Sequence, residues 1–220
     1  MTIYEAMINR HSVRNYQDKK IENNKIQTLT EEITLCNKEG SLDIQLITDD
    51  ENVFKGLMAH YGGFRNVKNY IALVGPTGDK LDEKLGYYGE RIALKAQQLG
   101  LNTCWVAVTY KKRKCKAIIK DNQTLVCVLA IGYGVTQGTA HKSKPMSQVC
   151  NVSTDMPAWF EKGMEAVLLA PTAMNKQNFM ITLESEKPRF EVKESKYSNI
   201  DLGIIKYHFE LGADITLEKW

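Results

Sequence analysis

Arginine and hydroxyl side chains gather close to the start of the chain, in the stretch RHSVRNY. If this stretch is extended, the two-residue repeat of a strand places Arg10, Ser12 and Arg14 on one side. His11 and Val13 then face the other side. Two guanidinium groups and a hydroxyl on one edge suit a phosphate, because charge-assisted, multidentate hydrogen bonds are the strong ones. The alternative interpretation is an exposed N-terminal arm with surface ion pairs.

A second polar stretch, LLAPTAMNKQNF, follows an apolar helix. Pro171 is expected to end that helix, and Thr172, Asn175 and Gln177 come before the next strand. Hydroxyl and amide groups in such a turn can donate to and accept from the polar rim of a heterocycle. As structure alone, the stretch is a capped turn.

A third cluster, of His141, Lys142 and Lys144, follows the predicted strand LAIGYG. It is either a solvated loop or a second set of phosphate donors. The neighbouring GYGVTQG has the spacing GxGxxxG, and no helix opens directly after it. The mechanism of a dinucleotide fingerprint is therefore missing from this stretch.

Hydrophobic periodicity predicts the helices and strands that must position these residues. Helices and strands alternate with no sustained linker, which indicates an α+β or α/β class with a mixed sheet. The predicted helices cover 2–9, 24–40 with Asn24 as N-cap, a short stretch near 52–59, 81–100, the solvated amphipathic stretch 111–120, a helix from Asp155 and Pro157 to Pro171, and 199–211. The predicted strands cover 42–46, 70–75, 104–108, 124–134, 179–184, 189–193 and 214–218.

The composition describes an ordinary folded protein. The chain has 220 residues, of which 43% are hydrophobic and 25% charged, close to the averages for globular proteins. The formal net charge is only +3, so the broad basic face of a nucleic-acid binder is not expected. The start lacks the apolar core of a signal peptide, and no apolar run approaches the roughly 18 residues of a membrane helix. We expect a cytoplasmic protein with no membrane or nucleic-acid partner.

Cysteine and histidine spacing argues against a metal site. The five cysteines are widely and irregularly spaced, without a CxxC pair, and are expected to be reduced and mostly buried. The four histidines lack the HxxxH spacing that sets two ligands on one helix face.

Four stretches together resemble the FMN-dependent nitroreductase family. They are RHSVRNY, YYGERIALKAQQLGLNTCWVAV, LAIGYG with the following HKSKP, and APTAMNKQNF. The resemblance implies an α+β fold with a nitroreductase-like mixed sheet flanked by helices. It also implies that the protein binds FMN and needs no catalytic side chain.

The resemblance assigns roles to the polar clusters. Arg10 and Ser12 would hold the flavin phosphate, with Lys142 and Lys144 completing that site, and Arg14 would face the pyrimidine end of the ring. The APTAMN segment would pass over the ring and the ribityl chain. The strand end after Trp105 would turn a backbone N–H toward the redox-active ring nitrogen. The full set implied to bind the cofactor is Arg10, His11, Ser12, Arg14, Ala107, Val108, Lys142, Lys144, Pro171, Thr172, Ala173 and Asn175.

Two features depart from the usual family pattern. Val108 stands where many relatives carry Gly, which would reduce access to the flavin. The APTAMN segment, which usually follows the arginine motif closely, lies in the second half of the chain, as in a rearranged sub-branch. One chain could then supply both sides of the site as a pseudo-dimer of two halves, 1–150 and 151–220. The stretches LGYYGERIALKAQQLG and NIDLGIIKYHFELGA echo each other faintly, which fits such a duplication. An ordinary or domain-swapped homodimer stays open.

The implied activity is ping-pong oxidoreduction, in which NAD(P)H reduces FMN and a small electron-poor acceptor, such as a nitroaromatic or quinone, takes the electrons. The alternatives are a flavin-binding sensor or carrier without useful turnover, and a flavin-free relative that keeps only the scaffold.

Overall fold

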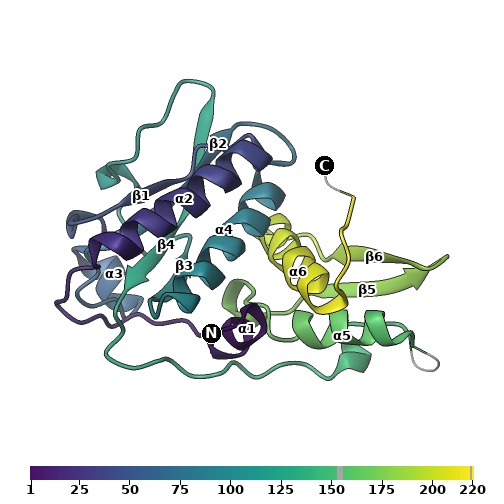
Figure 1. The fold of residues 1–220 in the computed structure, drawn as a ribbon. Helices are drawn as coiled ribbons and strands as arrows, with labels where there is room; N and C mark the ends of the chain where they lie inside the picture. The colour runs from purple at the N-terminus through teal and green to yellow at the C-terminus, as the bar shows by residue number, and fades with distance from the viewer. Residues whose placement is uncertain (153–155, 219) are drawn as a thin grey trace. The chain divides into compact units, whose positions relative to one another are not determined.

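The structure, a computed structural model, describes residues 1–152, 156–218 and 220 of the chain. Helices and strands alternate along it (Figure 1), and the predicted α+β class is confirmed. The chain forms two compact units. Unit 1 contains Met1–Leu81 and Ile92–Ala140, and unit 2 contains Asp82–Arg91 and His141–Trp220.

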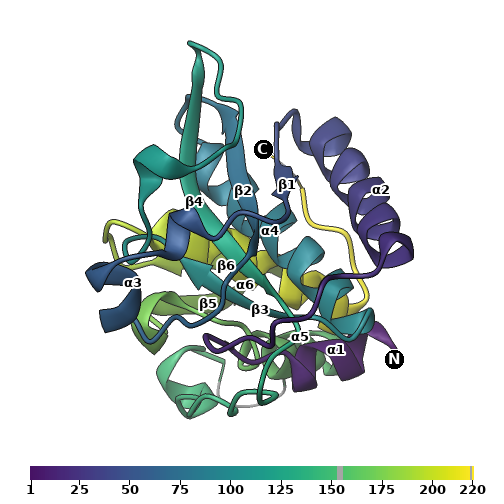
Figure 2. The ribbon, with the colours of Figure 1, turned by 90° about the vertical axis from the view of Figure 1, so that its left-hand side faces the viewer.

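Unit 1 is built on a four-stranded sheet in the order β1-β2-β4-β3 (Figure 2). The two central strands are continuous apolar runs and are almost entirely buried, as their composition predicts. The strands are β1 (Gln45–Ile47), β2 (Asn69–Pro76), β3 (Asn102–Val106) and β4 (Gln123–Gly132).

The strands of this sheet run antiparallel to their neighbours, whereas a mixed sheet was expected. All three ladders between these strands are antiparallel. A parallel component enters this unit through isolated bridges, such as that between Ser12 and Thr103 beside the edge strand β3.

The helices of unit 1 begin and end close to the predicted residues. Thr2 and Glu5 form a capping box, in which each accepts the other's backbone N–H. Asn24 does not cap the second helix, because its side chain accepts from Lys25 N–H inside the first turn. The helices are α1 (Ile3–Asn9), α2 (Asn23–Gly40) and α3 (Leu57–Tyr61), with a 3₁₀ turn at Asn52–Phe54.

Two predicted helices of unit 1 are wrong in extent. The stretch 52–59 is broken between the 3₁₀ turn and α3 by Gly56, whose φ of 132° belongs to neither helix. The stretch 111–120 forms only a 3₁₀ turn at Lys112–Lys114. Beyond it, Lys116 N–H donates to the Tyr70 hydroxyl and Ile118 N–H to Gln45 Oε1, so these donors serve distant side chains instead of a helix.

Unit 2 packs two helices beside a β-hairpin (Figure 1). The hairpin turn uses Ser185 and Glu186, both with positive φ (48° and 61°), as a two-residue turn requires. Phe160 and Phe209 pack edge to face between the helices, with ring centroids 5.4 Å apart. The elements are α5 (Ala158–Val167), β5 (Phe179–Glu184), β6 (Lys187–Val192) and α6 (Ser198–Ala213), with 3₁₀ turns at Met146–Gln148 and Ala173–Asn175.

The predicted ends of unit 2 need correction. α5 ends at Val167 and a turn separates it from Pro171, while Asp155, its predicted start, lies outside the described residues. The predicted final strand 214–218 is not a strand. There the N–H of Leu217 donates to Glu210 Oε1 at 2.6 Å, so the tail is held by the side chain of a helix.

The long helix α4 (Leu81–Gln98) contributes its first half to unit 2, where it crosses α6 at two glycines. A Cβ on Gly86 would lie 2.1 Å from the carbonyl oxygen of Ile200. A Cβ on Gly203 would lie 1.9 Å from the carbonyl oxygen of Glu83. Each glycine therefore meets the carbonyl three residues before the other glycine, so the contact is reciprocal.

Most of the cysteines are buried, as the sequence predicts. All five cysteines are free thiols, and all but Cys115 are buried. Among the described residues, no helix combines the length and apolar character needed to cross a membrane. Within the same ranges, no three His, Cys, Asp or Glu residues are grouped to hold a metal ion.

We predict that Gly203→Ala destabilises the protein by about 2–4 kcal/mol, because the added methyl group would push apart two helix backbones. Helix propensity alone predicts the opposite, a gain of about 1 kcal/mol. Urea denaturation measures the difference. Gly78→Ala is the control, since a Cβ at Gly78 meets no atom within 4 Å. A G203A protein as stable as the wild type would contradict the close crossing.

Candidate active site

In unit 1 the arginine stretch lies along the edge of β3. Val13 N–H donates to the Thr103 carbonyl at 3.0 Å, beside the bridge between Ser12 and Thr103. Val13 and Tyr16 are buried, and the Tyr16 hydroxyl donates to the Val13 carbonyl at 2.6 Å. The stretch is therefore anchored in the core of the unit, which a free N-terminal arm would not be.

The side chains alternate as a strand requires after Arg10. Ser12 and Arg14 are exposed, and Val13 between them is buried. Arg10 itself is only 3% exposed. It is the C-cap residue of α1, where its N–H still donates to the Ala6 carbonyl.

The pKa of one thiol, that of Cys104 on β3, responds to Arg10, Ser12 and Arg14. Burial raises the pKa of Cys104 and is the largest effect. Three smaller effects lower this pKa and so oppose part of the rise. They are the charge of Arg14, a hydrogen bond with Ser12 and the charge of Arg10. The three residues predicted to hold a phosphate all lie in unit 1.

His11 and Thr103 complete this group of side chains. Partial burial, followed by the charge of Arg10, lowers the pKa of His11 below its ordinary value, so its ring is neutral at pH 7. Thr103 is 1% exposed, and its Oγ1 has no hydrogen-bond partner among the described residues. A buried hydroxyl without a partner is uncommon and can serve a bound ligand. Its sequence signal, one Thr inside an apolar strand, was too weak to single it out.

Ala107 and Val108 follow the last residue of β3, beyond its ladder with β4, which ends at the pair Val106 and Val128. The Val108 side chain is 56% exposed. A Cβ on Gly62 would lie 2.9 Å from Thr109, and one on Gly63 would lie 3.7 Å from Arg14 Cδ. The Gly62–Gly63 turn therefore contacts both the loop after β3 and Arg14.

In unit 2, Gln177 joins the lysine loop to the APTAMN segment. Its Oε1 accepts from Lys144 N–H at 2.8 Å, and its carbonyl accepts from Lys144 Nζ at 2.9 Å. Its Nε2 donates to the Lys142 carbonyl at 2.9 Å, and its N–H donates to Thr172 Oγ1 at 3.0 Å. Asn175 Nδ2 also donates to the Lys142 carbonyl, at 3.0 Å. Gln177 is the organising residue here and is absent from the predicted cofactor set.

The backbone of the APTAMN segment is strained. Met174, Asn175 and Gln177 have φ values of 53°, 52° and 46°. Asn tolerates this left-handed region, but Met and Gln rarely adopt it. Such strain persists only where surrounding bonds enforce it, and it concentrates at ligand-binding segments. The Met174 side chain is 77% exposed at the top of this turn.

Asp201 on α6 holds the other end of the segment. Its Oδ1 accepts from Ala173 N–H at 2.9 Å. Burial raises the pKa of Asp201 to about 6, and the bond from Ala173 opposes this rise. No motif marked this residue, because its partner lies 28 positions away in the sequence.

The predicted cofactor residues therefore form two groups, one in each unit. The group around Cys104 and the end of β3 lies in unit 1, and the group joined by Gln177 lies in unit 2. The first group is Arg10, His11, Ser12, Arg14, Ala107 and Val108, and the second is Lys142, Lys144, Pro171, Thr172, Ala173 and Asn175.

Comparison with known proteins identifies the family. A family model described as "Putative TM nitroreductase" matches residues 2–213. The chain belongs to this nitroreductase family. The resemblance noted in its motifs is thereby confirmed, and a comparison with curated proteins found no match.

Solved structures agree with the nitroreductase fold. A structure described as a putative nitroreductase from Thermotoga maritima MSB8 has a TM-score of 0.71 and 22% identity, covering 96% of this chain and 83% of that chain. One described as a putative nitroreductase in complex with FMN, from Desulfovibrio desulfuricans, has a TM-score of 0.55 and 17% identity, covering 71% and 98%. A putative NADH oxidase from Clostridium acetobutylicum has a TM-score of 0.52 and 20% identity, covering 69% and 99%. At these identities the likeness establishes the fold of this nitroreductase.

We predict that Asp201→Asn stabilises the protein at pH 7.5 by about 1–3 kcal/mol. The folded protein holds the Asp201 proton up to about pH 6, whereas the ordinary pKa is 3.8. Stability therefore falls as the pH rises through this window, and Asn, which does not ionise, escapes the loss.

Urea denaturation at pH 5 and pH 7.5 tests this expectation, with a larger gain at the higher pH. Asp214→Asn is the matched control, because Asp214 is exposed at the C-cap of α6. Equal effects of D201N at both pH values would show that burial does not perturb this carboxyl.

Proposed function

We propose that this nitroreductase binds FMN and is an NAD(P)H-dependent oxidoreductase. The observation that carries the proposal is the stretch with Arg10, Ser12 and Arg14 along the edge of β3, beside the buried Thr103 hydroxyl, which has no hydrogen-bond partner among the described residues. Two guanidinium groups and hydroxyl donors are the chemistry that a phosphate dianion requires. The FMN in the Desulfovibrio desulfuricans structure, and a structure described as an FMN-dependent nitroreductase from Clostridium difficile R20291, support the choice of flavin.

FMN, when bound, would supply the hydride chemistry, and the protein would supply binding, orientation and electrostatics. Arg10 and Ser12 of unit 1 would hold the phosphate. Lys142 and Lys144 of unit 2 stay predicted phosphate ligands. The Lys144 ammonium donates to the Gln177 carbonyl, and this bond fixes its position. Arg14 would place a positive charge at the pyrimidine end of the ring, where it stabilises negative charge.

The remaining predicted residues would shape access to the ring. Ala107 and Val108 would present backbone N–H groups beyond the end of the β3 ladder. The APTAMN segment, which Gln177 and Asp201 hold in a strained conformation, would cover the ring and the ribityl chain. On this proposal NAD(P)H and an electron-poor acceptor, such as a nitroaromatic or quinone, use the same cleft in turn, and no side chain acts as an essential acid or base.

We also propose that one chain forms a pseudo-dimer of two related halves. The reciprocal contact of Gly86 with Ile200 and of Gly203 with Glu83 supports this. In an interface with two-fold symmetry, a contact from residue i of one half to residue j of the other is matched by a contact from j to i. The crossing of α4 and α6 has this form. Both glycines follow a leucine, in the stretches that echo each other in the sequence. The division at residue 150 stays a prediction.

We predict that the purified protein carries a visible flavin spectrum, that NADPH bleaches it, and that a nitroaromatic or quinone restores it. A flavin that NADPH does not reduce would favour the carrier or sensor alternative, which the exposed Val108 side chain motivates. A colourless protein that binds no FMN in calorimetry would contradict the proposal.

Arg14→Ala is expected to weaken FMN binding by about 10–100-fold, since hydrogen bonds to charged groups contribute about 1.5–3 kcal/mol. Arg113→Ala is the matched control, because Arg113 is exposed on the 3₁₀ turn at Lys112–Lys114. Calorimetric titration of the flavin-depleted protein gives both affinities. Equal losses in the two variants would remove Arg14 from the site.

Light scattering after size-exclusion chromatography is expected to give the mass of one chain, as a pseudo-dimer requires. A mass of two chains would favour the ordinary or domain-swapped homodimer.

A further inference from the structure

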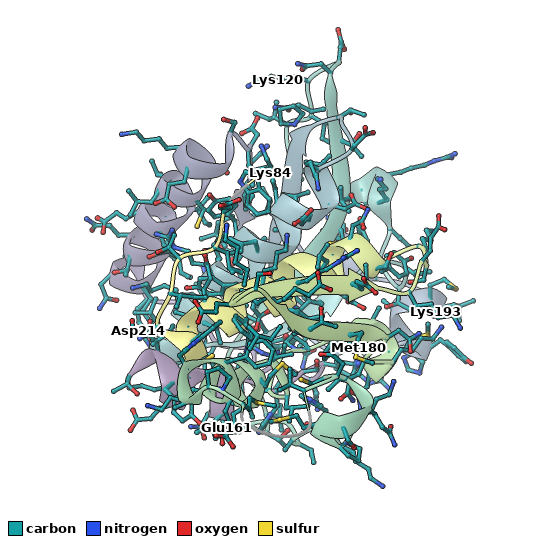
Figure 3. All side chains as sticks on the ribbon, turned by 90° about the vertical axis from the view of Figure 1, so that its right-hand side faces the viewer. Lys84, Lys120, Glu161, Met180, Lys193 and Asp214 are labelled. Carbon is teal, nitrogen blue, oxygen red and sulfur yellow. The ribbon has the colours of Figure 1, made fainter. Side chains whose placement is uncertain are left out.

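A cavity in unit 2 lies beside the APTAMN segment. Its volume is about 110 Å³, and its walls come from the turn at Ala173–Asn175, the hairpin of β5 and β6, and the start of α6. Lys193, which follows the last residue of β6, is labelled in Figure 3. The cavity can take one ring, with a phosphate group at its rim, but not a whole dinucleotide.

The floor of this cavity is apolar. Phe179 and Ile205 line it, and both are buried, with half-buried Val192 beside them. The Tyr197 ring adds an aromatic wall. Apolar and aromatic surfaces of this kind accept a planar heterocycle.

The rim is strongly basic. Lys176, Lys193 and Lys196 all line the cavity. Among the described residues, none of these three ammonium groups has a carboxylate within ion-pair distance, whereas Lys187 and Lys206 of the same unit each have one. Three like charges around one cavity repel one another, so a bound anion would lower the free energy of the site.

One acidic residue, Asp201, faces these lysines from α6. Its Oδ1 is engaged by Ala173 N–H, so it serves the turn that forms the other wall. Even with Asp201 ionised, three lysines and one aspartate leave two net positive charges at the cavity. The match is therefore to an anion of more than one charge, such as a phosphate monoester.

The position of the cavity suggests which phosphate it takes. Ala173 and Met174 line it, and the same segment is proposed to cover the flavin ring. A ligand here would lie next to the cofactor, where the electron donor must bind. Resting on the proposed function, we propose that this lysine pocket binds the adenosine end of NADPH, with the 2′-phosphate on the lysines and the adenine on the apolar floor. The pocket would then select NADPH over NADH.

Calorimetry tests the pocket without relying on turnover. The purified protein is titrated with adenosine 2′,5′-bisphosphate, with 5′-AMP and with inorganic phosphate. We expect the bisphosphate to bind at least about tenfold more tightly than either of the others, because only it carries both the base and the 2′-phosphate. Lys193→Gln with Lys196→Gln should abolish that advantage.

The matched control is Lys162→Gln with Lys187→Gln, which removes the same charge elsewhere in unit 2 and should keep the advantage of the bisphosphate. Circular dichroism checks that both double variants fold. The proposed pocket would be overturned if the bisphosphate did not bind or if it bound no more tightly than 5′-AMP. Equal losses of affinity in the two double variants would also overturn it. Phosphate that binds as tightly as the bisphosphate would overturn the assignment to NADPH.

Steady-state kinetics adds a second readout. The ratio of kcat/KM for NADPH to that for NADH should fall at least about tenfold in K193Q/K196Q and stay unchanged in K162Q/K187Q. A protein that binds FMN but not the bisphosphate would contradict the proposed NADPH pocket and leave the proposed flavin function standing. A protein that binds the bisphosphate through these lysines but binds no FMN would contradict the proposed flavin function. The lysine pocket would then remain as a nucleotide-binding site.

Discussion

Unit 2 depends on the close approach of two helix backbones. Gly86 and Gly203 leave room for carbonyl oxygens of the opposite helix, and a larger residue would separate α4 from α6. Separation would also break the polar pairs that span the crossing. These pairs are Glu83 with Lys206, Tyr87 with Glu210, and Glu90 with His208. Glu90 and His208 are fully buried, and a buried polar group that loses its hydrogen-bond partner costs about 1–3 kcal/mol. The two glycines therefore keep these side chains within bonding distance.

The candidate site uses a different physical device in each unit. In unit 1 a sheet edge fixes the arginine stretch, since Val13 and Tyr16 are buried while Ser12 and Arg14 stay exposed. In unit 2 no sheet is needed, because the buried Gln177 bonds the lysine loop to the APTAMN turn. The strained backbone of that turn is stabilised by these bonds and by Asp201 on α6. The loops that carry the proposed binding residues of unit 2 are thereby fixed by side-chain hydrogen bonds.

The helices and strands that depend on a local pattern of apolar residues were predictable from the sequence. β2 and β4 follow from unbroken apolar runs, and α4 follows from its apolar stripe and from Gly100, which has a φ of 75° just beyond its end. Predictions failed where distant groups took the backbone hydrogen bonds. The stretch 111–120 bonds to side chains of β1 and β2, and the C-terminal tail bonds to Glu210, so neither forms its predicted element.

By itself, the sequence determined the family and the stretches proposed to carry its chemistry, because residue types and short spacings are local properties. It also marked two helices as echoes of each other. Only the tertiary structure decided that these helices meet at their glycines and that Thr103 is buried beside Ser12. The organising role of Gln177, the partner of Asp201 and the cavity that three lysines share likewise came to light only in the fold. The physical reason is that burial and hydrogen bonding join residues far apart in the chain, and no local pattern records which of them will meet.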